Sequence, residues 1–261
     1  MKNYNRSCNS PSKIWLLLIC LLITFSINGC RGLLKASPAS NAGFIPNPEL
    51  LEKDPKNLPF HGVWLGDSYK MRKTLMTHTK IIIDPINIEY IEKKINSKNI
   101  PPKFKKERIE EAKEVAAYMR QKFIDEINAK ANGVLEIVET PEASAVRLQI
   151  AIVELTPTNA VTNLLGTTAS FFLPGIGILK RAAKGSVAFE ALIKDAETNE
   201  IMAAFKDRVT DKLSPISVKD FSQYAHTREA IDEWAEAFAK LLTAPLDTQI
   251  DTASLITLLP F

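Results

Sequence analysis

The chain has 261 residues, of which 46% are hydrophobic and 24% are charged, so it can bury a sizeable core. Its formal net charge of +3 equals the contribution of Lys2, Arg6 and Lys13, the only charged residues ahead of residue 30. The rest of the chain is formally neutral. This balance argues against a nucleic-acid partner, because nucleic-acid-binding domains usually carry a basic surplus.

The N-terminal segment has the layout of a secretory signal. The three basic residues precede an uncharged apolar run over residues 14–25, and a short, mostly small-residue segment then leads to Cys30. A cut directly before a cysteine is typical of bacterial lipoproteins. We therefore predict a signal peptide over residues 1–29 and a fatty acyl chain such as palmitate on Cys30. The alternative is an uncleaved signal anchor, but the run is about a dozen residues and a spanning helix needs roughly 20.

Cysteine content limits the chemistry of the mature chain. Cys8 and Cys20 lie in the leader, so cleavage leaves Cys30 as the only cysteine. An internal disulfide and a thiolate zinc site are therefore excluded for the mature chain. We expect a lipid-anchored protein of the cell envelope. Arg31 stands where an aspartate would signal retention in the inner membrane, which favours the outer membrane, facing the periplasm.

Residues 30–58 are predicted to form a proline-rich tether, since closely spaced prolines disfavour helices and central strands. Phe44-Ile45 and Leu50-Leu51 are apolar pairs that either dock onto the folded domain or belong to a disordered linker. Residues 59–261 are predicted to form a single α+β domain. Near its start, the aromatic residues around Trp64 are interpreted as the edge of the core, with an exposed binding surface as the alternative.

Apolar periodicity predicts the first elements of this domain. Alternating β-branched residues predict a strand over residues 79–91, with a break or bulge at Pro85. Apolar residues at steps of three and four predict a long amphipathic helix over residues 103–130, and Asn132-Gly133 supply its stop.

Four further strands are expected over residues 134–138, 145–155, 186–194 and 200–209. The last two are predicted to form a β-hairpin with Asn199 in its turn, because asparagine tolerates a positive φ. A final helix is predicted with Thr227 as its N-cap. The helices and strands are segregated along the chain, so we predict an α+β two-layer sandwich: a mainly antiparallel sheet of about five strands with two amphipathic helices on one face.

Residues 160–179 form an uncharged stretch that includes Phe171, Phe172 and Leu173. Its length suggests a membrane helix, but its glycines and Pro174 would leave backbone polar groups unpaired in lipid. An apolar loop or short helix folded over the sheet is the favoured interpretation. A loop that contacts a membrane or a partner through these three residues is the alternative.

No catalytic, metal or cofactor site is predicted. His61, His78 and His226 are the only histidines, and none has metal-ligand or acid–base spacing to another. They are interpreted as structural or exposed. Asp195, Glu197 and Asp207 suggest a cation site, but a hairpin turn explains them better because oxygen-ligand sites need more converging groups.

Several motifs along the chain occur together: the cysteine-terminated leader, an early strand ending in Asp-Pro, an apolar Pro-Gly loop, a strand–turn–strand segment and a closing helix. The strand ends in Asp84-Pro85, and the loop contains Leu173-Pro174-Gly175. The strand–turn–strand segment covers residues 185–208, and the closing helix carries Trp234-Ala235. Together they resemble the bacterial lipoprotein family catalogued as domain of unknown function 3313. The resemblance implies an exported lipoprotein with no known reaction, and it transfers no catalytic residue.

Three hypotheses for function follow. The first is a non-enzymatic envelope lipoprotein that binds an unknown envelope protein or assembles, with a homo-oligomer as one form. The second is an accessory lipoprotein of a pore or transport machine, which contacts the membrane through residues 160–179. The third is an envelope enzyme, for which His61, His78 and His226 would have to converge in one pocket.

Overall fold

The computed structural model describes residues 36–56, 58–67, 78–131, 133–157, 185–210, 224–243 and residue 250. Residues 38–261 belong to one compact unit. Within the described ranges this unit contains an open, mixed sheet of seven strands in the order β1-β2-β7-β6-β5-β3-β4.

Three long antiparallel strands form the centre of the sheet: β5 (Ala145–Thr156), β6 (Ser186–Asp195) and β7 (Ile201–Thr210). β6 and β7 form the predicted hairpin, and Asn199 adopts a φ of 57° in its turn. The Asp195 carboxylate accepts the backbone N–H groups of Glu197 and Thr198 at 3.0 and 2.8 Å. These bonds confirm that the hairpin turn accounts for Asp195 and Glu197. The same explanation was wrong for Asp207, which is buried in β7 and not in the turn.

The two edges of the sheet differ in direction. β2 (Gly62–Leu65) pairs antiparallel with β7, and β1 (Glu52–Lys53) pairs antiparallel with β2. On the other side, β3 (Lys80–Ile83) runs parallel to β5, and β4 (Glu136–Ile137) runs parallel to β3.

The predicted α+β class is therefore confirmed, but the predicted sheet was too small and too uniformly antiparallel. The two missed strands, β1 and β2, are two and four residues long, which is too short to show an alternating pattern. The parallel edge arises because a helical segment lies between β3 and β5, and such a crossover returns the chain in the same direction.

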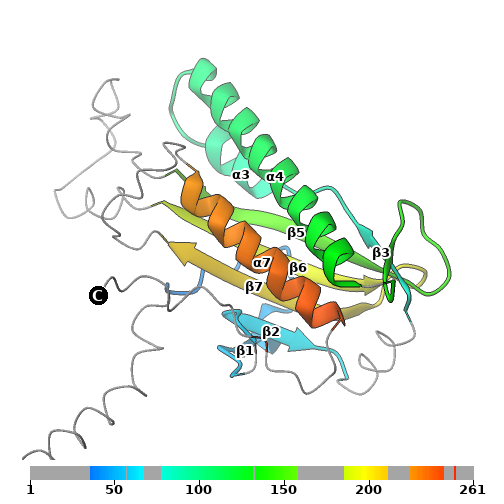
Figure 1. Ribbon diagram of the computed structural model, residues 1–261. Coiled ribbons are helices and arrows are strands. Elements are labelled where there is room, and N and C mark those ends of the chain that lie inside the picture. The colour runs from blue at the N-terminus through cyan, green and yellow to red at the C-terminus, as the bar shows by residue number, and fades with distance from the viewer. Residues whose placement is uncertain are drawn as a thin grey trace, which may run out of the picture. The chain divides into compact units, whose positions relative to one another are not determined.

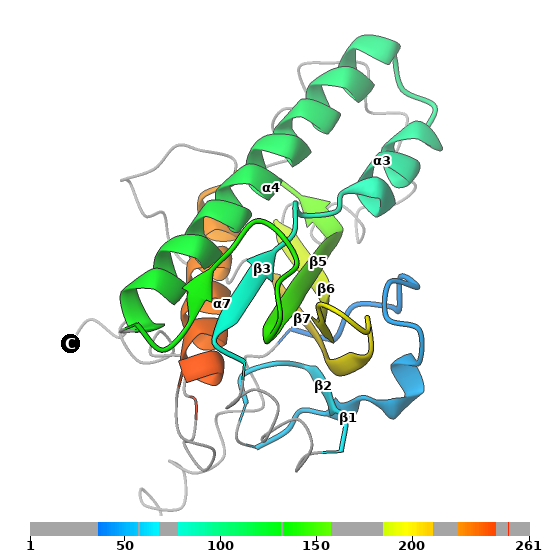
Figure 2. The ribbon, with the colours of Figure 1, turned by 90° about the vertical axis from the view of Figure 1, so that its right-hand side faces the viewer.

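Helices α4 (Pro102–Ala131) and α7 (Ala225–Thr243) lie side by side over one face of the sheet (Figure 1). Figure 2 shows the same two layers edge-on, with the helices to the left of the strands. The core between the layers includes five fully buried aromatic rings from both of them. These are Phe60, Phe123, Phe189, Phe205 and Phe238.

A third helix, α3 (Glu89–Asn96), was not predicted. The sequence predicts a strand over residues 79–91, but β3 ends at Ile83, and beyond it only Asn87 forms an isolated bridge to the sheet. The Asn87 side chain accepts the Glu89 N–H at 2.8 Å, and Ile91 and Ile95 are buried one turn apart. The alternation of apolar residues that predicted a strand thus overlaps the start of a helix, whose buried residues are four positions apart.

The start of the last helix also differs from the prediction. α7 begins at Ala225, and Thr227 is a buried residue inside it rather than its N-cap. The predicted long helix agrees closely with α4, and Pro102 occupies its first position, where a missing N–H costs nothing.

Candidate functional site

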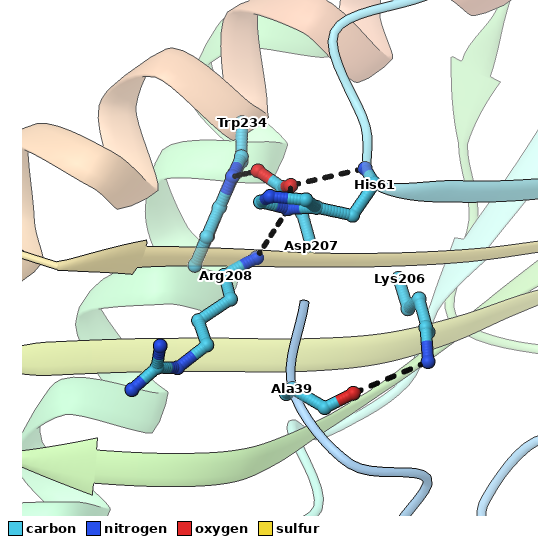
Figure 3. A network of polar contacts seen from close by, with 6 residues as sticks. All are labelled: Ala39, His61, Lys206, Asp207, Arg208 and Trp234. Atoms are coloured by element: carbon cyan, nitrogen blue, oxygen red, sulfur yellow. Dashed lines mark hydrogen bonds and ion pairs between the residues drawn. The ribbon is translucent and has the colours of Figure 1, made fainter. Parts of the chain in front are cut away.

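On the helix-covered face of the sheet, a buried carboxylate joins three parts of the chain. Asp207 lies in β7, and its Oδ1 accepts the backbone N–H of His61 at 3.1 Å and contacts Nδ1 of the same histidine. Its Oδ2 accepts the indole N–H of Trp234, in α7, at 2.8 Å. Figure 3 shows these side chains meeting between the chain at His61, strand β7 and helix α7.

The strand and helix periods place these groups together. Phe205 and Asp207 are two residues apart in β7 and face the helices, while Trp234 lies on the buried side of α7. An unpaired carboxylate at this depth would cost several kcal/mol. Donors on both oxygens offset that cost. We interpret the Asp207 network as a structural tie that fixes β2 and α7 to the centre of the sheet.

On the opposite face of the sheet, a second buried carboxylate holds the N-terminal strap, which we define as residues 39–53. Glu190 lies in β6 and is only 2% exposed. Its two carboxylate oxygens accept the backbone N–H groups of Ala42, Phe44 and Ile45 at 2.7, 3.0 and 3.1 Å. One side chain thus fixes the backbone of the strap at three points.

Lys206 holds the strap from the neighbouring strand. It is the direct cross-strand partner of Glu190 in the β6–β7 register. Its Nζ donates to the Ala39 carbonyl at 3.2 Å and to the Asn41 side-chain oxygen at 2.7 Å, and the first of these bonds is visible in Figure 3.

Apolar contacts complete the seat of the strap. Ile45 and Leu51 are 4% and 7% exposed and pack with Leu192 and Ala204 of the sheet. The structure therefore supports docking of both apolar pairs onto the domain, through Phe44, Ile45 and Leu51, while Leu50 stays exposed. The strap ends in β1, so its last residues are part of the sheet itself.

A third polar network lies farther along the same face. Arg208 donates to both carboxylate oxygens of Glu154, at 3.0 and 2.7 Å, and Ser186 donates to one of them at 2.5 Å. Burial by itself raises the pKa of Glu154, but the bonds from Arg208 and Ser186 outweigh it and hold that pKa below its usual value. This network joins β5, β6 and β7 and pairs one charge of each sign.

The three histidines bind different carboxylates rather than one another. His61 contacts Asp207, and the Nε2 of His78 lies 3.1 Å from Asp195 Oδ2. His226 lies 3.3 Å from Glu229, its neighbour on the first turns of α7. Asp207 pairs with Phe189 across the β6–β7 register, and Asp195 lies six residues beyond Phe189 in β6. The two carboxylates are therefore about 20 Å apart along the strands. The described residues thus do not form the convergent histidine pocket that the enzyme hypothesis required.

Other predicted site residues, Cys30 and Phe171, Phe172 and Leu173, lie outside the described residues, so the lipidation and loop predictions stay predictions. Among the described helices, none has the length and apolar character needed to span a membrane. The described residues also contain no group of three side chains placed to hold a metal ion.

Glu190, Lys206 and Asp207 were not predicted to act together with the strap or with Trp234. The available signal was a charged residue in the middle of an otherwise apolar strand, as with Glu190 between Val187 and Ile193. A buried charge needs partners. The partners of Glu190 and Asp207 include groups more than 140 residues away in the sequence, and hydrophobic periodicity does not reveal such pairings.

Comparison with known proteins identifies a family. A family model described as "Protein of unknown function (DUF3313)" matches residues 65–238, from the last residue of β2 into α7. No curated protein matches the sequence.

Several solved structures share a likeness in the path of the chain. PelC from Paraburkholderia phytofirmans, described as a dodecamer, has 9% identity and a TM-score of 0.36, with 66% of this chain and 92% of that chain covered. A minor lipoprotein from Acinetobacter baumannii has 12% identity and a TM-score of 0.33, with 64% and 94% covered. The hypothetical protein CT253 from Chlamydia trachomatis has 9% identity and a TM-score of 0.35, with 64% and 98% covered. These scores are too low to carry an argument about activity or assembly.

Proposed function

Because the chain belongs to the DUF3313 family, whose model matches residues 65–238, we propose that it is an envelope lipoprotein, anchored through Cys30, that binds or assembles with another envelope protein. In this proposal the chain is exported to the outer membrane, faces the periplasm and catalyses no reaction. The cysteine-terminated leader and the neutral charge of the mature chain support the proposal.

The observation that carries the proposal is the seating of the N-terminal strap. A flexible linker between a lipid and a domain would leave the domain free to move. Here Glu190 and Lys206 hold the backbone from Ala39 to Ile45 against the central strands. The chain is thus fixed to the sheet within twelve residues of Cys30.

This short connection limits how far the sheet can lie from the anchor. Twelve fully extended residues, from Cys30 to Ala42, span at most about 40 Å. A lipid on Cys30 would therefore keep the domain close to the membrane surface. Such a placement suits a protein that meets its partner at a membrane rather than one that reaches across the periplasm.

The anchor is tested by mass spectrometry of the chain purified from membranes. We expect the mature protein to begin at Cys30 and to carry fatty acyl chains on that residue. In a second experiment, the mature part with Cys30→Ala is exported behind a leader that ends without a lipobox, and it should leave the membrane fraction in high salt. Unmodified Cys30, or a chain that still begins at Met1, would contradict the proposal.

Partner binding is tested by chemical crosslinking in intact cells, followed by affinity capture of the acylated protein and of the Cys30→Ala form. A binding component should crosslink to the same envelope protein, or to a second copy of itself, only when it is acylated. Recovery of the chain without any crosslinked product would contradict a role in assembly.

A further inference from the structure

The connection between α3 and α4 concentrates positive charge on a formally neutral mature chain. We call residues 93–108 the basic tip. It contains seven basic residues and one acidic residue, Glu107. The basic residues are Lys93, Lys94, Lys98, Lys103, Lys105, Lys106 and Arg108. Figure 2 shows the α3–α4 end of the helical layer extending past the ends of the strands.

Few close ion pairs neutralise this charge, although the charges of Lys94 and Lys106 favour the ionised forms of Glu154 and Glu110 and lower the pKa of both. Lys93 and Lys103 have only loose pairs with Glu89 and Glu107, at 3.8 and 3.9 Å. Within the described ranges, the other basic residues of the tip form no ion pair. The surrounding protein partly desolvates the Lys98 amine and lowers its pKa, and the like charges of Arg108 and Lys94 lower that pKa further. Positive charges are therefore crowded together at the tip.

The position of the charges on α4 is also unfavourable for the helix. Lys103, Lys105, Lys106 and Arg108 lie in its first two turns, and the first turn holds no acidic residue. The positive end of the helix dipole disfavours cations there. Lys105 is compensated, because its Nζ donates to the Asn96 carbonyl at the end of α3 at 2.8 Å. The remaining repulsion would be relieved by an external anion, and local conflicts of this kind are typical of functional sites.

An exposed aromatic side chain accompanies the charges. Phe104 lies among the lysines on α4 and is 38% exposed, one of three large hydrophobic residues that are exposed in the described part of the chain. Basic residues around an apolar side chain suit a bilayer surface, where the cations meet lipid phosphates and the ring enters the interface.

We propose that the basic tip is a second membrane contact, which binds the headgroups of anionic phospholipids independently of the lipid on Cys30. The strap lies beside the base of α3, because Phe44 contacts Tyr90 with ring centroids 6.4 Å apart. The tip begins three residues after Tyr90. The inference rests on the proposed function only in that an anchored chain places this region within reach of a bilayer.

The test uses the mature chain, residues 30–261, with Cys30→Ala, which retains the whole compact unit from Pro38 onward. Its binding is measured by co-sedimentation with vesicles of phosphatidylcholine, alone or mixed with phosphatidylglycerol. We expect binding to the mixed vesicles and loss of this binding in high salt. The variant Lys94→Gln/Lys98→Gln/Lys106→Gln should bind on the order of a hundredfold more weakly, since each cation near an anionic surface contributes about a factor of five.

A matched variant controls for net charge. Lys53→Gln/Lys56→Gln/Lys113→Gln removes the same number of exposed lysines from outside the tip and should bind as the parent does. Phe104→Ser should weaken binding without changing its salt dependence. The inference is overturned if the parent does not distinguish the two vesicles, or if both triple variants lose affinity equally. Binding of the tip to polyglutamate but not to the mixed vesicles would assign it to an acidic protein and would also overturn it.

The two proposals can fail separately. If Cys30 is acylated but the chain does not bind the mixed vesicles, the anchor is supported and the second membrane contact is rejected. Tip-dependent binding by a chain whose Cys30 is never acylated would reject the anchor and leave the second contact.

Discussion

Glu190 fixes three backbone amides of the strap with one side chain, and this arrangement predicts a large effect of its removal. Glu190→Ala should lower the free energy of unfolding by about 2–3 kcal/mol, because buried N–H groups lose their acceptor. Denaturant unfolding measures the loss. Hydrogen exchange at Ala42, Phe44 and Ile45 should accelerate, whereas exchange in β6 should change less.

Glu197→Ala is the matched control for this prediction. Glu197 is exposed in the hairpin turn, and its substitution should alter stability by no more than about 0.5 kcal/mol. Equal losses for the two variants would show that Glu190 does not hold the strap.

Trp234 tests the Asp207 network in the same way. Trp234→Phe keeps an aromatic ring against Phe189 but removes the N–H that Asp207 Oδ2 accepts. The stability cost should be about 1–3 kcal/mol, because one oxygen of a buried carboxylate is left without a donor. Trp64→Phe, at a partly buried position, is the control and should cost less. A neutral Trp234→Phe variant would argue that water or another donor replaces the indole.

At the scale of elements, the sequence predicted the helices and turns whose stabilising contacts are close together in the chain. The hairpin of β6 and β7, the turn at Asn199 and the long helix α4 all follow from spacing and turn chemistry within one stretch of chain. The failures have equally physical reasons. At residues 86–91, Ile86, Ile88 and Tyr90 fit a strand, but Ile88, Ile91 and Ile95 fit a helix, and packing against β5 decides in favour of the helix. At the start of α7, the helix extends two residues ahead of the apparent cap at Thr227.

The seam between α4 and α7 predicts a dependence of stability on pH. Tyr118, on α4, donates to Asp232, on α7, at 2.8 Å. Burial, and then this hydrogen bond, raise the pKa of Tyr118 to about 12. An unfolded tyrosine titrates near pH 10, so the unfolded chain loses a proton that the folded chain still keeps. Stability should therefore be complete below about pH 10 and fall as the pH rises towards 12.

Tyr118→Phe isolates this contribution from the titration of lysines in the same pH range. The variant should be less stable than the parent at neutral pH, because Asp232 loses a donor, and its stability should fall less steeply between about pH 10 and 12. Unfolding by denaturant at a series of pH values measures both effects. Parallel curves for parent and variant would contradict the assignment.

At the scale of the whole molecule, the sequence predicted the fold class but not how its distant parts meet. The α+β class follows from the order of periodic segments. The pairing of β2 with β7 and the seating of the strap on Glu190 join opposite ends of the chain. Those contacts have no local signature, which is why docking of the strap was only one of two interpretations, and why neither its hold by Glu190 nor the Asp207 network was predicted.

Truncation separates the contribution of residues 30–37 from that of the strap. Removing residues 30–37 should leave the stability of the domain nearly unchanged, because the compact unit begins at Pro38. Removing residues 30–53 should lower the free energy of unfolding by more than about 3 kcal/mol, since Ile45 and Leu51 lose their burial and Glu190 loses its donors. Thermal unfolding of the two truncated chains gives the comparison. Similar melting temperatures would show that the strap contributes little.

The pairing of β2 with β7 also has a consequence in time. Gly62 of β2 pairs with Lys206 of β7, and the strap binds Glu190 of β6, so the strap, β1 and β2 cannot take their native places until β6 and β7 are available. Closing so long a loop is slow compared with forming the local β6–β7 hairpin. If the chain is exported from its N-terminus, as proposed, the strap would be the first part of the domain to emerge and among the last to become ordered.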